Sequence, residues 1–347
     1  MSKSSLLRGA AASLLLVVMA PGALAPGAMA QPADQFFRGK TISLYIGFAG
    51  GGSYDYYARL VARYIGKHIP GNPTVVAQTM AGAGSFQLAN FLFASAPRDG
   101  TAMGTISQTV ALEDALHSPG VRYKAGEFTW IGRATAILEV AMTGPTAKAK
   151  HFADAQVHET PVAGTGAGSP SEGYPKLMNA LAGSKFKVIS GYPGSTQGMM
   201  AMEAGEVDGG FTSWNTLKRT KQEWLQKNLI NVLYQCALER HPDLAAIPTD
   251  VELGTTPEAR RILAFYTSSA MVGRSIVAPP GIPADRVTVL RRAFDAMLKD
   301  PELLAEIERS HQEFQPASGE ELQKLIEETA NAPREVVERA EAILRTK

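Results

Sequence analysis

The stretch TISLYIGFAGGGSYD, from Thr41 to Asp55, decides the fold of this chain. Ile42, Leu44 and Ile46 alternate with less apolar residues, which is typical of a strand with one buried face. Three consecutive glycines follow, and Ser53 is placed to cap a helix. The apolar face of that helix has spacings of three and four residues: Tyr57, Leu60, Val61, Tyr64 and Ile65, with Gly66 as the end signal. The stretch therefore predicts a strand, a glycine turn and a helix.

This strand–glycine–helix unit has the features of an anion-binding site. Unpaired backbone N–H groups and the positive end of the helix dipole converge at such a turn. No Lys-Ser/Thr pair follows the last glycine, and the G-x-G-x-x-G spacing of a dinucleotide fold is absent. The alternative, left open by the local sequence, is that the glycines only allow a tight turn.

Residues 1–30 are predicted to be a cleaved signal peptide. Lys3 and Arg8 supply positive charge, residues 10–20 form an apolar core, and Ala28-Met29-Ala30 is a small-x-small cleavage signal. A second triplet, Ala23-Leu24-Ala25, leaves the cleavage position open. The apolar core is shorter than the roughly 20 residues of a membrane span. We therefore expect an exported protein that begins near Gln31, located in a periplasm.

Cysteine content and charge restrict the chain further. Cys236 is the only cysteine, so no disulfide can form within the chain, and its apolar surroundings predict a buried, unreactive thiol. The 34 basic residues nearly balance the 33 acidic residues, without a basic block. This balance argues against nucleic acid or a membrane surface as the main partner.

Strands and helices alternate along the rest of the chain, which predicts α/β domains with parallel sheets. A second glycine turn lies at 81–85, after a strand at 74–78, and a third at 164–169, after a strand near 162. Ligands of such sheets bind at the carboxyl ends of the strands, where these turns lie. The length after cleavage favours two domains, so we expect a ligand cleft between them. Helical patterns occupy most of residues 287–344.

The motifs of common catalytic sites are absent from the sequence. None of the six histidines has metal-ligand spacing, and no serine lies in a G-x-S-x-G motif. We expect no metal, no cofactor and no enzymatic activity. An enzyme would need an acid–base pair across the cleft, and Asp55 with Asp208 is the pair that the sequence offers. For Asp55, a role as dipole partner of its own helix is the stronger interpretation.

Seven short motifs follow one another along the chain: GFAGGGSYD at 47–55, MAGAGS at 80–85, APRDGT at 96–101, GAGS at 166–169, YPG at 192–194, GEVD at 205–208 and APPGIP at 278–283. Taken in order, they resemble those of the extracytoplasmic solute receptors of the tripartite tricarboxylate transporter family, the Bug or TctC-like proteins. The resemblance covers essentially the whole chain after residue 30. Departures are Ala49-Gly50 in place of a proline, and Thr79 and Ala81 in place of asparagine and proline.

The resemblance implies a periplasmic-binding fold of type II, in which two α/β lobes with parallel-type sheets enclose a ligand cleft. The chain would cross between the lobes near 132–136 and again near 265–274. The implied division is a signal peptide at 1–30, a first lobe at 31–134, a second lobe at 135–268, and a return to the first lobe at 269–347.

The resemblance also implies a function. Such receptors hold carboxylates through backbone amides and small hydroxyls, and deliver them to a permease of one large and one small integral membrane subunit. We expect a monomer; signalling to a membrane histidine kinase is an alternative that the sequence leaves open, as is the identity of the acid. The expected ligand-binding residues are Phe48, Gly51, Gly52, Ser53, Tyr54, Asp55, Gly84, Ser85, Gln108, Thr165, Gly166, Ala167, Gly168, Ser169, Tyr192, Gly194 and Asp208.

Overall fold

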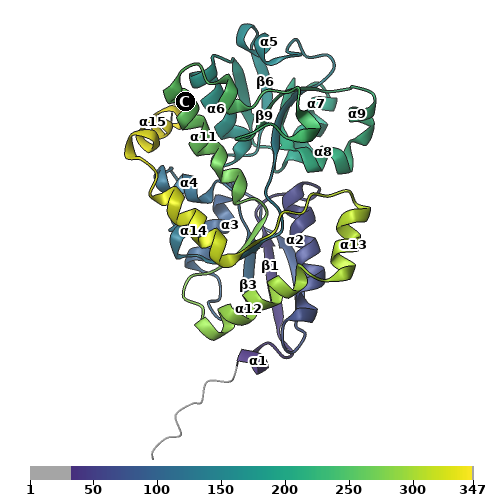
Figure 1. Cartoon of the computed structure of the whole chain (residues 1–347), viewed down its shortest axis with the longest axis vertical. Coiled ribbons are helices and arrows are strands. Elements are labelled where there is room, and N and C mark those ends of the chain that lie inside the picture. Colours follow the sequence, from purple (N-terminus) through teal and green to yellow (C-terminus); the bar gives the residue numbers. More distant parts are fainter. Residues whose placement is uncertain (1–32, 346–347) are drawn as a thin grey trace, which may run out of the picture. The chain divides into compact units, whose positions relative to one another are not determined.

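The computed structural model describes residues 33–345, and the predicted signal peptide lies outside them. Two sheets, each covered by helices, organise this part of the chain (Figure 1). We call the elements around the first sheet the first lobe and those around the second sheet the second lobe.

The first sheet has six strands in the order β11-β4-β10-β3-β1-β2 within the described residues. Their bounds are β1 Thr41–Ile46, β2 Thr74–Thr79, β3 Ala102–Thr105, β4 Thr129–Arg133, β10 Ser275–Ala278 and β11 Ala317–Ser318. β1 pairs in parallel with β2 and β3, which confirms the predicted opening unit. The side chains of Ile42, Leu44 and Ile46 are fully buried, as the alternation predicts.

The second sheet is also made of parallel and antiparallel strands, and its order within the described residues is β7-β6-β8-β5-β9. Its strands are β5 Glu139–Thr143, β6 Thr160–Gly164, β7 Phe186–Ser190, β8 Gly209–Ser213 and β9 Asn231–Cys236. β6 is parallel to β7 and β8, whereas β5 is antiparallel to β8 and β9. Cys236 is buried here without a disulfide, as predicted, and burial raises the pKa of its thiol well above the usual value.

The expectation of parallel-type sheets is therefore only partly met, because both sheets are mixed. β10 is antiparallel to β3 and β4. The reason is the path of the chain: β10 brings it back from the second lobe, so it enters the first sheet against the direction of the earlier strands.

Helices cover both sheets. Those of the first half are α1 Ala33–Phe36, α2 Ser53–Tyr64, α3 Phe86–Ala94, α4 Val110–Ala115, α5 Phe152–Val157, α6 Pro170–Ala182 and α7 Ser195–Glu203. They are followed by α8 Trp214–Thr220, α9 Gln222–Gln226, α10 Asp250–Leu253, α11 Pro257–Thr267, α12 Ala284–Met297, α13 Pro301–Arg309, α14 Gly319–Ala330 and α15 Arg334–Leu344. No helix in the range 33–345 combines the length and the apolar character that crossing a membrane requires.

Two chain segments that connect the lobes are hydrogen-bonded to each other. The N–H of Ala134 donates to the carbonyl of Arg274 at 3.1 Å, and the N–H of Arg274 donates to the carbonyl of Thr135 at 2.9 Å. Between them Gly273 has a φ of +56°, and a Cβ there would lie 2.1 Å from the Thr135 carbonyl oxygen. Only glycine fits this approach, so the two connections are joined closely.

The C-terminal helices divide between the lobes. α14 packs against β4 and α4 of the first lobe, whereas α15 packs against α6 and α11 of the second (Figure 1). Ala340 of α15 is fully buried among second-lobe side chains. The division implied by the resemblance placed residues 269–347 with the first lobe, but the amphipathic face of α15 is buried on the second.

Candidate ligand-binding site

Two neighbouring cavities lie where the lobes face each other. The inner cavity has a volume of about 50 Å³ and the outer one about 380 Å³, and Phe48 and Thr165 line both. Known ligand pockets span about 300–1,000 Å³, so the outer cavity alone reaches the usual size. The inner lining also contains Ala49, Gly52, Ser53, Tyr54, Glu139, Pro170, Ser171, Gly194, Ser195, Phe211, Ser213 and Arg274.

Besides α8, whose N-cap Ser213 accepts a hydrogen bond from the N–H of Thr216, three helices of the described chain begin at the inner cavity. Gly52 and Ser53 belong to the start of α2, Pro170 and Ser171 to the start of α6, and Gly194 and Ser195 to the start of α7. None of these helices has a side-chain hydrogen bond at its N-cap. Their first-turn N–H groups and dipoles therefore give the cavity a positive potential that suits an anion.

The structure places the predicted residues at different depths. Phe48, Gly52, Ser53, Tyr54, Thr165 and Gly194 line the inner cavity, and Gly84, Gly166 and Tyr192 line the outer one. Ala167 and Gly168 line another cavity, of about 510 Å³, on the side of α4 and α15. Gly51, Asp55, Ser85, Gln108, Ser169 and Asp208 line none of these three cavities within the described chain.

Ser53 has a role other than the predicted cap. Gly52 is the N-cap of α2, and Ser53 is the first residue of the helix. The Ser53 Oγ instead accepts a hydrogen bond from Arg274 Nε at 2.8 Å. Ser169 is the N-cap of α6, but its hydroxyl lies 2.9 Å from the Ser171 hydroxyl rather than on a backbone N–H.

Asp55 and Asp208 do not form a pair across the cleft. Asp55 accepts a hydrogen bond from the N–H of Gly51 and pairs with Arg59 at 2.6 Å, so it stabilises its own turn and helix. Asp208 precedes β8, and its N–H donates to the carbonyl of Pro161 near the start of β6. It therefore lies at the edge of the second sheet opposite the cavities, which begin where β6 ends.

Tyr54 and Gln108 stabilise the wall of the inner cavity. The Tyr54 ring stacks on Phe48 with centroids 4.3 Å apart, and its hydroxyl accepts a hydrogen bond from the N–H of Gln108 at 2.8 Å. Burial raises the pKa of Tyr54 above its usual value, so the hydroxyl stays neutral. Gln108 is fully buried, and its Nε2 has no hydrogen-bond partner within the described part of the chain. Ser85 is also internal: its Oγ accepts from the N–H of Ser107 at 3.2 Å.

Glu139 and Arg274, which no sequence motif indicates, form a buried ion pair at the inner cavity. Arg274 Nη2 lies 3.0 Å from Glu139 Oε1, and the Arg274 side chain is only 2% exposed. The guanidinium also lies over the Tyr54 ring, 3.7 Å from its centroid. Both residues adjoin the connections between the lobes, and that position was the signal that could have pointed to them.

The glycine turns of the two lobes contact each other directly. A Cβ on Gly84 would lie 2.3 Å from the carbonyl oxygen of Ala167 and 2.8 Å from that of Gly166. Beside this contact, the hydroxyl of Thr109 donates to the carbonyl of Gly168 at 2.6 Å. The turns predicted to hold a ligand thus also form part of the interface between the lobes.

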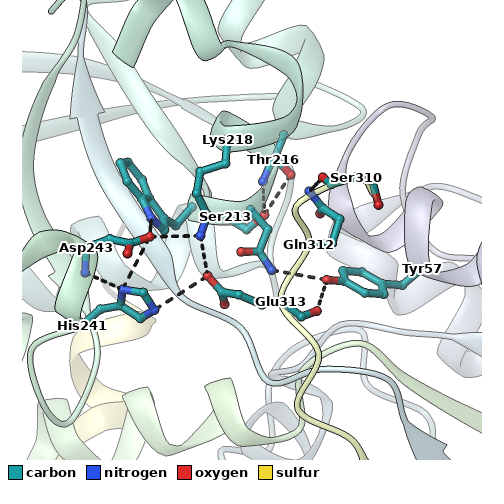
Figure 2. A network of polar contacts seen from close by, with 11 residues as sticks. Tyr57, Ser213, Thr216, Lys218, His241, Asp243, Ser310, Gln312 and Glu313 are labelled. Atoms are coloured by element: carbon teal, nitrogen blue, oxygen red, sulfur yellow. Dashed lines mark hydrogen bonds and ion pairs between the residues drawn. The ribbon is translucent and has the colours of Figure 1, made fainter. Parts of the chain in front are cut away.

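A polar network connects the lobes at another point (Figure 2). Glu313, in the segment between α13 and β11, accepts a hydrogen bond from Lys218 of α8 at 3.0 Å, and His241 Nε2 lies 3.7 Å from it. Lys218 also lies 3.0 Å from Asp243. Burial acts to lower the pKa of Lys218, but the hydrogen bonds to Asp243 and Glu313 raise it above the usual value.

The same network contains a cluster of one histidine and two carboxylates with the spacing of a metal site, which the sequence did not indicate. Ligand atoms of His241, Asp243 and Glu313 lie within 4.8 Å of one another, as a metal site would require. The ammonium of Lys218 already contacts both carboxylates, so one of their two negative charges is compensated without a metal ion.

Comparison with solved structures identifies proteins of the same fold. BugD, a periplasmic binding protein, has a TM-score of 0.70 at 19% identity, over 88% of this chain and 98% of that chain. MatC of Rhodopseudomonas palustris, solved with malate, has a TM-score of 0.68 at 20% identity, over 89% of this chain and 100% of that one. A second R. palustris protein, solved with adipate, has a TM-score of 0.68 at 19% identity, over 88% of this chain and 98% of that one.

Two neighbours with this fold, the periplasmic binding protein BugD and a TctC solute binding protein from Polaromonas, are of the type that the sequence motifs resemble. The mixed α/β fold with two sheets is thus that of type II periplasmic binding proteins. No protein-family model and no curated protein sequence matches the chain.

Proposed function

We propose that this chain is a solute receptor of the tripartite tricarboxylate transporter family, and that it binds a small organic acid between its lobes. The observation that carries the proposal is the convergence of the α2, α6 and α7 N-termini on one cavity. Because these helices come from both lobes, an anion at the cavity stabilises their approach.

The wall of the cavity suits the rest of such a ligand. The hydroxyl groups of Ser171, Ser195 and Thr165 offer hydrogen bonds, while Phe48 and Phe211 offer apolar contact. A few polar groups on a mainly apolar wall are typical of sites for small molecules. The fold of the malate- and adipate-bound neighbours supports the same choice of ligand class.

The proposal includes the cellular setting. The receptor would act in the periplasm after removal of residues 1–30, as a monomer, and deliver its ligand to a permease with one large and one small membrane subunit. The enzymatic alternative loses its candidate pair, because Asp55 and Asp208 lie at different edges of the fold.

Ligand screening tests the proposal. Purified protein beginning at Gln31 would be melted in the presence of carboxylic acids, and each acid that raises the melting temperature would then be titrated by calorimetry. Ligand at 100 times its dissociation constant adds roughly 2.7 kcal/mol to the free energy of unfolding. Recovery of the unchanged acid by mass spectrometry supports a receptor, conversion of the acid supports an enzyme, and no binding of any acid contradicts the proposal.

A further inference from the structure

We infer that the inner cavity selects acids with a single carboxylate and disfavours dicarboxylates; this rests on the proposed function and specifies its ligand. The inference starts from charge. Of the described residues that line the inner cavity, Glu139 and Arg274 are those with a charged side chain, and they form an ion pair at 3.0 Å. The side chains of the cavity wall therefore contribute no net charge.

Arg274 is not available as a clamp for a ligand carboxylate. Its Nε donates to Ser53, its Nη1 donates to Gln108 at 2.7 Å, and its Nη2 donates to Glu139. Tyr54 covers one face of the guanidinium. With 2% of its side chain exposed, Arg274 is committed to these partners.

The positive charge that remains comes from the helix termini. Each helix N-terminus is equivalent to about half an elementary charge, so α2, α6 and α7 together supply at most about 1.5 charges. The carboxylates of Asp55 and Glu172, in the first turns of α2 and α6, offset part of this charge. This matches one carboxylate, whereas two carboxylates would exceed it. A second carboxylate would also lose its hydration without gaining a positive partner of its own.

The apolar part of the wall lies beside the carboxylate and continues at Phe48 into the outer cavity, which has the volume for the rest of the ligand. The stacked rings of Phe48 and Tyr54 lie on one side of the cavity, and Phe211 of β8 lies in the second lobe. An uncharged aliphatic or aromatic body gains from contact with these rings, and a second charged group does not.

Pairs of acids with equal chain length test the inference on the wild-type protein. Butyrate is compared with succinate, and hexanoate with adipate, by calorimetry and thermal shift at low ionic strength. We expect the monocarboxylate to bind at least tenfold more tightly in each pair. If a dicarboxylate binds as tightly as its partner or more tightly, the inference is overturned while the proposed function stands. If no acid of any kind binds, both fail.

Two variants test the origin of the selectivity. Glu139→Gln keeps an oxygen that can accept from Arg274 but leaves one net positive charge, so it should improve dicarboxylate binding relative to monocarboxylate binding by tenfold or more. The double variant Glu139→Gln with Arg274→Met restores a neutral wall and should return the preference to that of the wild type. Glu335→Gln, on the surface of α15, is the control and should change neither the affinity for monocarboxylates nor that for dicarboxylates.

The single variant leaves a buried arginine without its counter-charge, and this can destabilise the fold. Thermal melts of each variant establish which of them are folded. If Glu139→Gln unfolds, the neutral double variant and the comparison of paired acids on the wild-type protein still test the inference. Equal selectivity in wild type, single variant and double variant would contradict the assignment to this ion pair.

Discussion

Replacement of Gly84 by alanine should prevent the lobes from reaching the arrangement seen in this structure. The new Cβ would lie 2.3 Å from the Ala167 carbonyl oxygen, and ordinary contact begins at 3.4 Å. The turns must therefore separate by about 1 Å, since the obstacle is backbone and cannot rotate away. The hydrogen bond from Thr109 to Gly168, now 2.6 Å long, would be stretched by a similar amount.

The backbone conformation of Gly84 adds a second cost to the alanine variant, in the free energy of unfolding, and a matched variant at Gly39 measures this cost. Gly84 has a φ of +63°, and an alanine in this left-handed region costs about 1–2 kcal/mol. Gly39 has a φ of +69°, and a Cβ added there would meet no atom within 4 Å, so Gly39→Ala carries the strain without the collision. The difference between the two variants isolates the effect of contact between the lobes.

Calorimetry with an acid identified by the screen, together with small-angle scattering, provides the assay. We expect Gly84→Ala to bind at least tenfold more weakly than Gly39→Ala and to have a larger radius of gyration with ligand present. Both variants should lose similar thermal stability from strain. If Gly84→Ala binds and compacts like Gly39→Ala, then the contact between the glycine turns has no part in ligand binding.

Three further predictions concern other parts of the molecule. Glu313→Gln weakens the contact of this side chain with the Lys218 ammonium of the second lobe by about 1 kcal/mol, so it should lower ligand affinity about fivefold in titrations. The control Glu308→Gln, exposed on the neighbouring helix α13, should leave the affinity unchanged. Equal affinities of the two variants would exclude a role for the contact between Glu313 and Lys218. Burial raises the pKa of Glu113 from 4.5 to about 7, so the stability present below pH 4.5 should fall as pH rises through 7, by on the order of 3 kcal/mol, and Glu113→Gln should remove this loss in melts across that range. N-terminal sequencing of protein from its native host should find a start near Gln31, and an intact leader would contradict periplasmic export.

The sequence predicted the local units of this fold well, because each carries its own pattern. The alternation before Gly50 and the helical spacing after Ser53 were sufficient to place β1 and α2. The helix N-cap is Gly52 rather than the predicted Ser53, since the Ser53 hydroxyl bonds Arg274 instead of the backbone. That partner is 221 residues away, beyond any local signal.

The parts that the sequence did not reveal depend on contacts between distant segments. Glu139 and Arg274 are 135 residues apart, and nothing in either neighbourhood indicates a pair. The glycine turns were predicted as ligand sites from their composition, but composition could not show that Gly84 lies against Gly166. The helical spacing of α15 predicted an apolar face but gave no information about which lobe would bury it.

The path of α14 and α15 has a mechanical consequence. α14 is anchored on the first lobe and α15 on the second, and residues 331–333 between them span at most about 11 Å when extended. This tether acts like a short strap along one side of the molecule (Figure 1). On the side that carries Glu313 and α8, the lobes meet through side-chain contacts, among them Lys218 with Glu313 and Arg219 with Tyr56. We therefore expect separation of the lobes to be directional, with the strapped side as a pivot and solute entry from the side of Glu313.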